Sequence, residues 1–355
     1  MVHPADTVIG EMEAAALYRR LTLRRVLALC AGTVALAACF ALDVATGPAV
    51  LPLGEVVRTL LGQQADPAVV AIVWRIRLPV ALMAVIVGAA LSVSGVVMQT
   101  VMNNPLASSY TLGLSAAAGF GAALAVVAGS AIPLSAAVAV PGMAFVFALL
   151  ACTAVLGFAR WRGAGTETLV LAGIAVMFLF QALLSLLQFV ASPEALAQIV
   201  FWLFGSLLNA TWPRFWLVAI VLALLLPLLL RDGWQLTALR LGEDRARALG
   251  VRPWALRIRA LAAVSVLTGI AVAFVGTIGF VGLVAPHLAR SVLGEDQRFL
   301  IPGSVLAGGL LLSAASVASK TLVPGAIFPI GIVTALVGVP FLFWLIGSKR
   351  RVYWA

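Results

Sequence analysis

Charged residues are scarce in this sequence: they make up 10% of 355 residues, whereas hydrophobic residues make up 63%. Soluble domains carry about a quarter charged residues, so the composition excludes a soluble globule and indicates a chain solvated by lipid. The formal net charge is +10. The distribution of these charges along the chain is more informative than their sum, and we predict membrane lipid and no nucleic acid as a partner.

The residue types that bind metals or catalyse reactions are also few. The cysteines, Cys30, Cys39 and Cys152, lie in apolar blocks. On one helix Cys30 and Cys39 are about 13 Å apart along the axis and face opposite sides, so we predict no disulfide and no metal site. The histidines are His3 and His287, and no histidine–carboxylate cluster has metal-ligand spacing. We therefore predict no catalytic residue.

A nucleotide-binding loop is missing as well. The two lysines, Lys320 and Lys349, do not follow a glycine in a G-x-x-x-x-G-K-[ST] pattern. The chain therefore has no phosphate-binding loop of its own and binds no cofactor directly. Any energy that it needs must come from a partner.

Long apolar runs fill most of the sequence. A bilayer-crossing helix needs about 20 apolar residues, and by this measure we predict an all-α membrane protein with about ten spans, of which the eighth is short and interrupted by proline. The predicted spans are 24–43, 80–101, 108–129, 134–158, 168–191, 213–231, 258–277, 279–293, 301–320 and 328–347.

The basic residues predict the orientation. With the N-terminus inside, eighteen lysines and arginines face the cytoplasm and five face outward, which matches the positive-inside rule. The apolar run after Arg25 is too long for a cleaved signal. We predict a cytoplasmic tail at 1–23, one transmembrane domain at 24–348 with a cytoplasmic loop at 232–257, and a cytoplasmic tail at 349–355.

The outward segments and the interiors of the spans carry further signals. Residues 44–73 form a sizeable outer segment, and 192–212 predict an amphipathic helix at the outer surface. No acidic residue falls in the middle of a predicted span. Ion-driven carriers usually need an ionisable group there, so this absence weighs against secondary transport.

One polar stretch stands between the apolar blocks. Arg231 to Arg259 contains seven arginines and three acids. Within it, Leu239 to Val251 predicts two short helices hinged at Gly242 and stopped at Gly250. We interpret the segment as a docking surface for a soluble partner. The alternative is an arginine-rich loop that only fixes the topology.

Six segments together resemble the FecCD family of ABC-transporter permeases, the importers of ferric siderophores, haem and vitamin B12. They occur in the family's order and extend over almost everything after residue 70. They are RLPVALMAVIVGAALSVSGVVMQTVMNNPLA (77–107), YTLGLSAAAGFG (110–121), LVLAGIA (169–175), LGEDRARALGV (241–251), GTIGFVGLVAPHLAR (276–290) and FPIGIVTALVGVPFLFWLI (328–346).

The resemblance implies a type II importer in the bacterial inner membrane. Two permease subunits, expected here to be identical, would surround the path, and a periplasmic binding protein would deliver the substrate. A cytoplasmic ATPase dimer would use ATP and Mg²⁺, so the permease itself is not an enzyme. The chain departs from relatives at Val80, Ser316 and Ile327. The GAIFPIG turn favours a ferric siderophore, with haem and then cobalamin as alternatives. An ion-coupled carrier and a scaffold or receptor without transport are the alternatives of other classes.

Three groups of residues receive roles. The resemblance places the inner gate at Thr166, which also suits an ordinary helix N-cap. It places binding-protein docking at Arg77 and Lys320, which alternatively anchor their helices at the interface. The segment predicted to couple to the ATPase contains Leu241, Gly242, Glu243, Ala246, Leu249 and Gly250.

Overall fold

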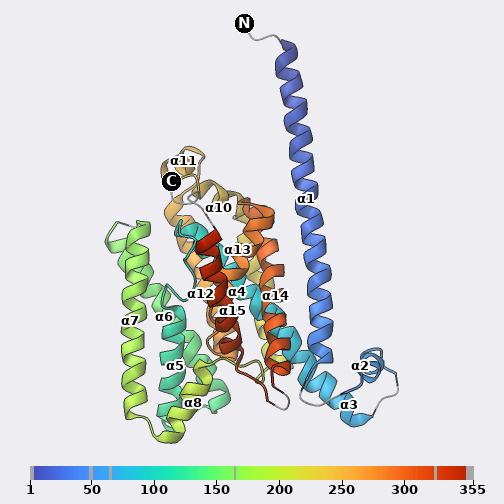
Figure 1. Cartoon of the computed structure of the whole chain (residues 1–355). Coiled ribbons are helices and arrows are strands. Elements are labelled where there is room, and N and C mark those ends of the chain that lie inside the picture. Colours follow the sequence, from blue (N-terminus) through green and yellow to red (C-terminus); the bar gives the residue numbers. More distant parts are fainter. Residues whose placement is uncertain (1–3, 48–50, 64–65, 164, 324–325, 349–355) are drawn as a thin grey trace.

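The computed structural model describes residues 4–47, 51–63, 66–163, 165–323 and 326–348, and within these ranges all regular structure is helical (Figure 1). The predicted all-α class is confirmed. The α-helices are α1 Pro4–Ala45, α2 Leu53–Leu60, α3 Pro67–Ile72, α4 Leu78–Val101, α5 Leu114–Ala128, α6 Ala136–Trp161, α7 Thr166–Val190, α8 Pro193–Leu203, α9 Trp212–Arg231, α10 Gly233–Leu239, α11 Glu243–Ala248, α12 Pro253–Val275, α13 Val281–Leu293, α14 Gln297–Thr321 and α15 Ile330–Ser348.

Seven of the described helices are long and apolar enough to cross a membrane, and four shorter apolar helices accompany them. Each of the ten predicted spans contains a helix; the eighth is the 13-residue α13, with Pro286 inside it. The number of complete crossings stays a prediction. Helix α1 begins at Pro4 and so includes most of the predicted tail, whereas the predicted C-terminal tail at 349–355 lies outside the described residues.

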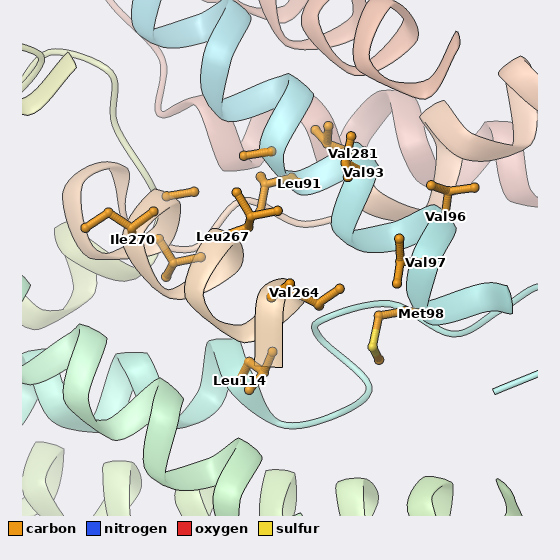
Figure 2. Packing of buried hydrophobic residues seen from close by; sticks show 14 of the residues in the cluster. Leu91, Val93, Val96, Val97, Met98, Leu114, Val264, Leu267, Ile270 and Val281 are labelled. Carbon is orange, nitrogen blue, oxygen red and sulfur yellow. The ribbon is translucent and has the colours of Figure 1, made fainter. Parts of the chain in front are cut away.

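Helix α4 is the centre of the molecule and is buried on nearly every side by α12, α13 and α14. Small residues permit this packing, because they let helix backbones approach closely. A Cβ at Gly95 would lie 1.7 Å from the Gly282 carbonyl oxygen of α13, and one at Gly88 would lie 2.2 Å from the Gly308 carbonyl oxygen of α14. Figure 2 shows the apolar core between α4 and α12.

The peripheral helices expose their apolar side chains. Helix α1 packs mainly against α14 and α4 and is otherwise open along its length. On the other side of the molecule, α5, α6 and α7 form a group (Figure 1). Phe120, Phe147 and Phe180 join these three helices, with ring centroids 5.0 to 6.1 Å apart. The open faces are those that lipid or further subunits cover.

A π-turn joins two helices into one long element. Helix α3 continues through the π-helix Val73–Arg77 into α4, so that the helical run extends from Pro67 to Val101. Asp66 caps its start by accepting a hydrogen bond from the Ala68 backbone N–H at 2.8 Å. A π-turn contains one more residue than an α-turn, and it brings Arg77 to a buried position against the end of α1.

The two ends of the molecule differ in their elements (Figure 1). Helices α10 and α11 and the turn between α6 and α7 lie at one end, which the arginine distribution assigns to the cytoplasm. Helices α2, α3 and α8 lie at the opposite end. The predicted outer helix is α8, where Ser192 accepts a hydrogen bond from the Ala195 N–H at 3.2 Å.

Candidate functional site

The cytoplasmic segment contains two short helices, but the first differs from the prediction: α10 ends at Leu239, so only α11 lies within the predicted range Leu239–Val251. Gly242 has φ +99° and Gly250 has φ +82°, and a Cβ at either position would meet nothing within 4 Å. Both glycines are therefore required by the backbone conformation and not by lack of space. The hinge and the stop predicted from the sequence are confirmed.

Buried polar contacts fix α11 to the membrane helices. Arg257 of α12 is buried and donates from Nη1 to Glu243 Oε1 at 2.6 Å, and its Nε lies 3.4 Å from the Val101 carbonyl oxygen at the end of α4. Glu243 also pairs with Arg247 at 2.6 Å. Because Glu243 opens the helix, its charge faces the positive end of the α11 dipole as well. Glu243 thus connects α11 to α12 and, through Arg257, to α4.

A second chain of hydrogen bonds fixes α10. The Thr237 hydroxyl accepts from the Gln297 N–H at 3.1 Å, and Gln297 Nε2 donates to the Thr100 hydroxyl at 2.8 Å. Gln297 and Thr100 are both buried. The first residue of α14 therefore links α10 to the cytoplasmic end of α4. Any displacement of the α10–α11 segment reaches three transmembrane helices.

The surface of this segment is apolar at two points. Leu241 is 53% exposed and Leu249 is 50% exposed. They flank α11, and their side chains are open to a partner at the surface of the segment. Ala246, in contrast, is fully buried. Its side chain belongs to the hydrophobic core and holds α11 against the rest of the molecule.

Charged side chains surround the segment on the α13–α14 turn. Glu295 pairs with Arg290 at 2.9 Å and with Arg240 of the docking segment. Next to it, Asp296 accepts hydrogen bonds from the Arg298 side chain at 2.8 and 3.0 Å. This contact with Arg298 holds the pKa of Asp296 below its ordinary value. Asp296 therefore stays ionised and paired with Arg298 at neutral pH.

Thr166 is the first residue of α7, at the cytoplasmic turn after α6. Gly165 occupies the N-cap position and no side chain caps it. The alternative role of Thr166 as the N-cap is therefore wrong, because the residue lies one position inside the helix. Its side chain is partly exposed.

Arg77 and Lys320 are turned inward. The Arg77 guanidinium donates to the Val44 and Ala45 carbonyl oxygens at 3.1 and 2.7 Å. Lys320 Nζ lies 2.7 Å from Asp43 Oδ1 in an ion pair that is nearly inaccessible to solvent. Both cations therefore hold the outer end of α1 against α4 and α14. The sequence offered anchoring at the interface as an alternative role for both cations, but it did not predict these partners, since no pattern relates Asp43 to Lys320.

An apolar cavity opens at the outer half of the molecule. It has a volume of about 580 Å³ and no charged residue in its lining. Backbone contacts shape it: the Gly331 N–H donates to the Phe204 oxygen and the Ile330 N–H to the Gly205 oxygen, both at 3.1 Å. The lining residues are Leu203, Phe204, Thr277, Gly279, Phe280, Gly331, Ile332, Ala335, Leu336, Val339 and Pro340.

The sequence contains one signal for this cavity: glycines at the positions where the chain segments around it come close together. A Cβ at Gly331 would lie 2.4 Å from the Phe204 oxygen, and one at Gly276 would lie 2.2 Å from the Trp202 oxygen. Such glycines mark places where backbones touch. Among the described residues, no group of three histidine, cysteine or acidic side chains could hold a metal ion.

These features define the membrane-spanning component of a transport protein: apolar helices, a cytoplasmic contact segment tied to them, and an apolar cavity at the opposite half. Comparison with known proteins gives the family. The FecCD transport family matches residues 35–348, and the chain belongs to that family. The matched region includes both the contact segment and the cavity.

Several relatives match along most of their length. The hemin transport system permease protein of Yersinia pestis is 38% identical over 298 residues, 83% of this chain and 88% of that protein. The vitamin B12 import system permease protein of Citrobacter koseri is 37% identical over 284 residues, 79% of this chain and 84% of that protein. An iron chelatin transport system permease protein of Helicobacter pylori is 38% identical over 282 residues, 79% and 84% respectively.

A solved structure agrees with the fold. A metal-chelate type ABC transporter in an inward-facing conformation has a TM-score of 0.81 and 31% identity, covering 90% of this chain and 99% of that one. The chain is therefore an ABC importer permease of the FecCD family and a multi-pass protein of the inner membrane.

Proposed function

We propose that this chain is the permease subunit of an ATP-driven importer that moves a ferric siderophore from the periplasm to the cytoplasm. Two copies form the path, a periplasmic binding protein delivers the chelate, and a separate ATPase dimer binds the α10–α11 segment and hydrolyses ATP with Mg²⁺. The relatives' names support a large iron- or cobalt-containing cargo: hemin, an iron chelatin and vitamin B12.

The observation that carries the proposal is the construction of the α10–α11 segment. Its exposed side, at Leu241 and Leu249, is available to a partner, and its inner side is tied to α12 and α4 through Glu243 and Arg257. The pair resists separation mainly on the Arg257 side, because the buried guanidinium would lose an ionic partner inside the protein, whereas Glu243 is one third exposed. If the ATPase moved α11, the cytoplasmic ends of α12 and α4 would therefore move together with α11.

The test is the substitution Leu249→Asp, with Leu249→Met as the matched control. Leu249 is half exposed, so neither change disturbs the core. In liposomes containing the permease, its ATPase and its binding protein, Leu249→Asp should lower chelate-stimulated ATP hydrolysis and uptake at least tenfold, and Leu249→Met should retain both. Unchanged uptake by the aspartate variant would remove the coupling role, and uptake driven by an ion gradient without ATP would establish a secondary carrier instead.

The identity of the chelate rests on two observations. The cavity lining contains no charge, so it suits a cargo with a neutral or apolar outer surface. The GAIFPIG turn has Ile327 where haem and cobalamin permeases of the family carry an acid, and this favours a siderophore. Equilibrium binding of a ferric siderophore, haem and cobalamin to the cognate binding protein decides among the three, and tight binding of haem or cobalamin alone would reassign the substrate.

The gate role of Thr166 is part of the same proposal. The residue starts α7 at the cytoplasmic end and its side chain is not needed as a cap, which leaves it free to line a constriction. Cysteine at position 166 in both copies should cross-link, with a yield that changes when nucleotide is added. Absence of cross-linking in every nucleotide state would place Thr166 away from the axis.

Docking of the binding protein by Arg77 and Lys320 needs an additional step. Both cations already have internal partners at the end of α1. Acidic groups of the binding protein would have to replace those partners, so we propose that docking loosens the end of α1. Cross-linking of α1 to α14 at this end should then decrease when the binding protein is added.

A further inference from the structure

Helix α2 carries an apolar face that only partly contacts the rest of the molecule. Val56 is buried in a small cluster with Val44, Val69, Val73 and Ala81. The neighbouring apolar side chains are open: Val57 is 46% exposed, Leu60 39% and Leu61 69%. Residues three and four apart share one face of a helix, so these three form one apolar surface, which we call the α2 face.

The opposite side of α2 is polar. Glu55 is exposed and is two positions from Val57, which places the two side chains on roughly opposite sides, about 160° apart at 100° per residue. Arg58 is exposed as well and lies between Glu55 and the α2 face, at the edge of that face. A short helix with one apolar face and charges on the other is the pattern of an element that lies in a membrane interface.

The packing fixes the depth of α2. Val56 contacts the cluster that contains Val44, which is the penultimate residue of the membrane-crossing part of α1, Tyr18–Ala45. Helix α2 therefore lies at the level where α1 leaves the bilayer. Val73 of the same cluster is followed in the chain by Trp74. The Trp74 carbonyl oxygen accepts a hydrogen bond from Trp212 Nε1 at 2.9 Å. Tryptophans of this kind mark the boundary between headgroups and acyl chains.

The surroundings of α2 are the lipid-facing side of α1. Figure 1 shows α2 beside the end of α1, on the side away from α14. Helix α1 itself is open along most of its length, and its exposed side chains include the apolar Leu42 and Val34. The α2 face thus continues a surface that the membrane already covers.

From these observations we propose that α2 is an interfacial lipid anchor. Val57, Leu60 and Leu61 insert among the acyl chains of the outer leaflet, and Glu55 and Arg58 remain at the headgroups. The anchor holds the outer end of α1 laterally, at the point where Asp43 pairs with Lys320. This function is separate from transport by the path, and it requires only that the chain lies in a bilayer.

The test measures the depth of single side chains in the reconstituted transporter. The three cysteines are first replaced by alanine, and Val57→Cys, Leu61→Cys and the matched control Glu55→Cys are then labelled with an environment-sensitive fluorophore. Labels at 57 and 61 should emit at shorter wavelength and be quenched several-fold more by lipid-borne nitroxide than by aqueous iodide. The label at 55 should show the reverse order.

Two results would overturn the anchor. Iodide quenching at 57 and 61 as strong as at 55 would mean that the α2 face is open to water. Protection from both quenchers, together with cross-linking of position 61 to another chain, would mean that a protein covers it. If the variant at 57 does not fold, the label at 61 still tests the proposal. Leu61 directly follows α2 and is 69% exposed, so cysteine at this position should not disturb the fold.

Discussion

The buried pair of Asp43 and Lys320 gives a sharp prediction for the outer end of the molecule. Lys320 Nζ lies 2.7 Å from Asp43 Oδ1 and 3.1 Å from the Asp43 carbonyl oxygen. Asp43 is fully buried and the Lys320 side chain is 7% exposed. The substitution Lys320→Met keeps the length of the side chain and removes its charge, so Asp43 would remain as a buried carboxylate without its partner.

The expected loss follows from this burial. Removing one member of a buried ion pair costs about 3–5 kcal/mol, whereas replacing both members by apolar groups is often neutral or stabilising. Lys320→Met and Asp43→Leu should therefore each lower the free energy of unfolding by about that amount. The double variant should lose much less than either single variant, which gives a large favourable coupling in the double-mutant cycle.

The assay is reversible unfolding of the purified protein in mixed micelles, with all four members of the cycle measured under the same conditions. Circular dichroism follows the helix content. If the losses in the two single variants simply add in the double variant, the two side chains do not interact and the reasoning is refuted. A stable double variant that still binds the binding protein would show in addition that neither charge is needed at that interface.

Three further changes test other contacts. Gly95→Ala should cost at least about 1–3 kcal/mol by overpacking, because its Cβ would lie 1.7 Å from the Gly282 oxygen; the control Gly142→Ala, with nothing within 4 Å, should be neutral or slightly stabilising in the same unfolding assay. Ala246→Leu should lower the melting temperature of the protein, because Ala246 is fully buried and the larger side chain does not fit; an unchanged melting temperature would contradict this packing. Arg298 holds the pKa of Asp296 below 3.8, so its stabilisation is complete above that pH and is lost as the pH falls through the lowered pKa. Asp296→Asn should therefore flatten the acid limb of the stability–pH curve, and an unchanged limb would count against the contact.

Much of the fold could be predicted from hydropathy, because a lipid environment requires long apolar helices. The ten predicted spans coincide with helices, and Gly242 and Gly250 correctly marked the ends of α11. The short eighth span was predicted as well. Helix α13 has only 13 residues, since its neighbours bury it and it does not need to meet lipid along its full length.

The candidate sites were predictable only in part. Local signals, such as the glycines and charges around Leu249, predicted the position of α11, and its docking role stays a prediction. Contacts between distant residues left no such signal: Asp43 and Lys320 are 277 positions apart. The burial of Ala246 could not be predicted either, because a small residue on a polar helix gives no indication of which side is covered. The periodicity of a helix predicts its apolar face but does not show which other helix packs against that face.

The π-turn at Val73–Arg77 has a consequence for how sequences of this kind can change over time. The turn holds one residue more than an α-turn, so it takes up an extra residue within a single turn and the helix continues on both sides with little rotation. A residue lost or gained elsewhere in the regular part of this run would instead turn everything before it by about 100°. Val69, now in the cluster with Val44, would then leave that cluster. The turn is therefore the place in the run from Pro67 to Val101 where the chain can change its length by one residue and still keep the outer segment against the end of α1.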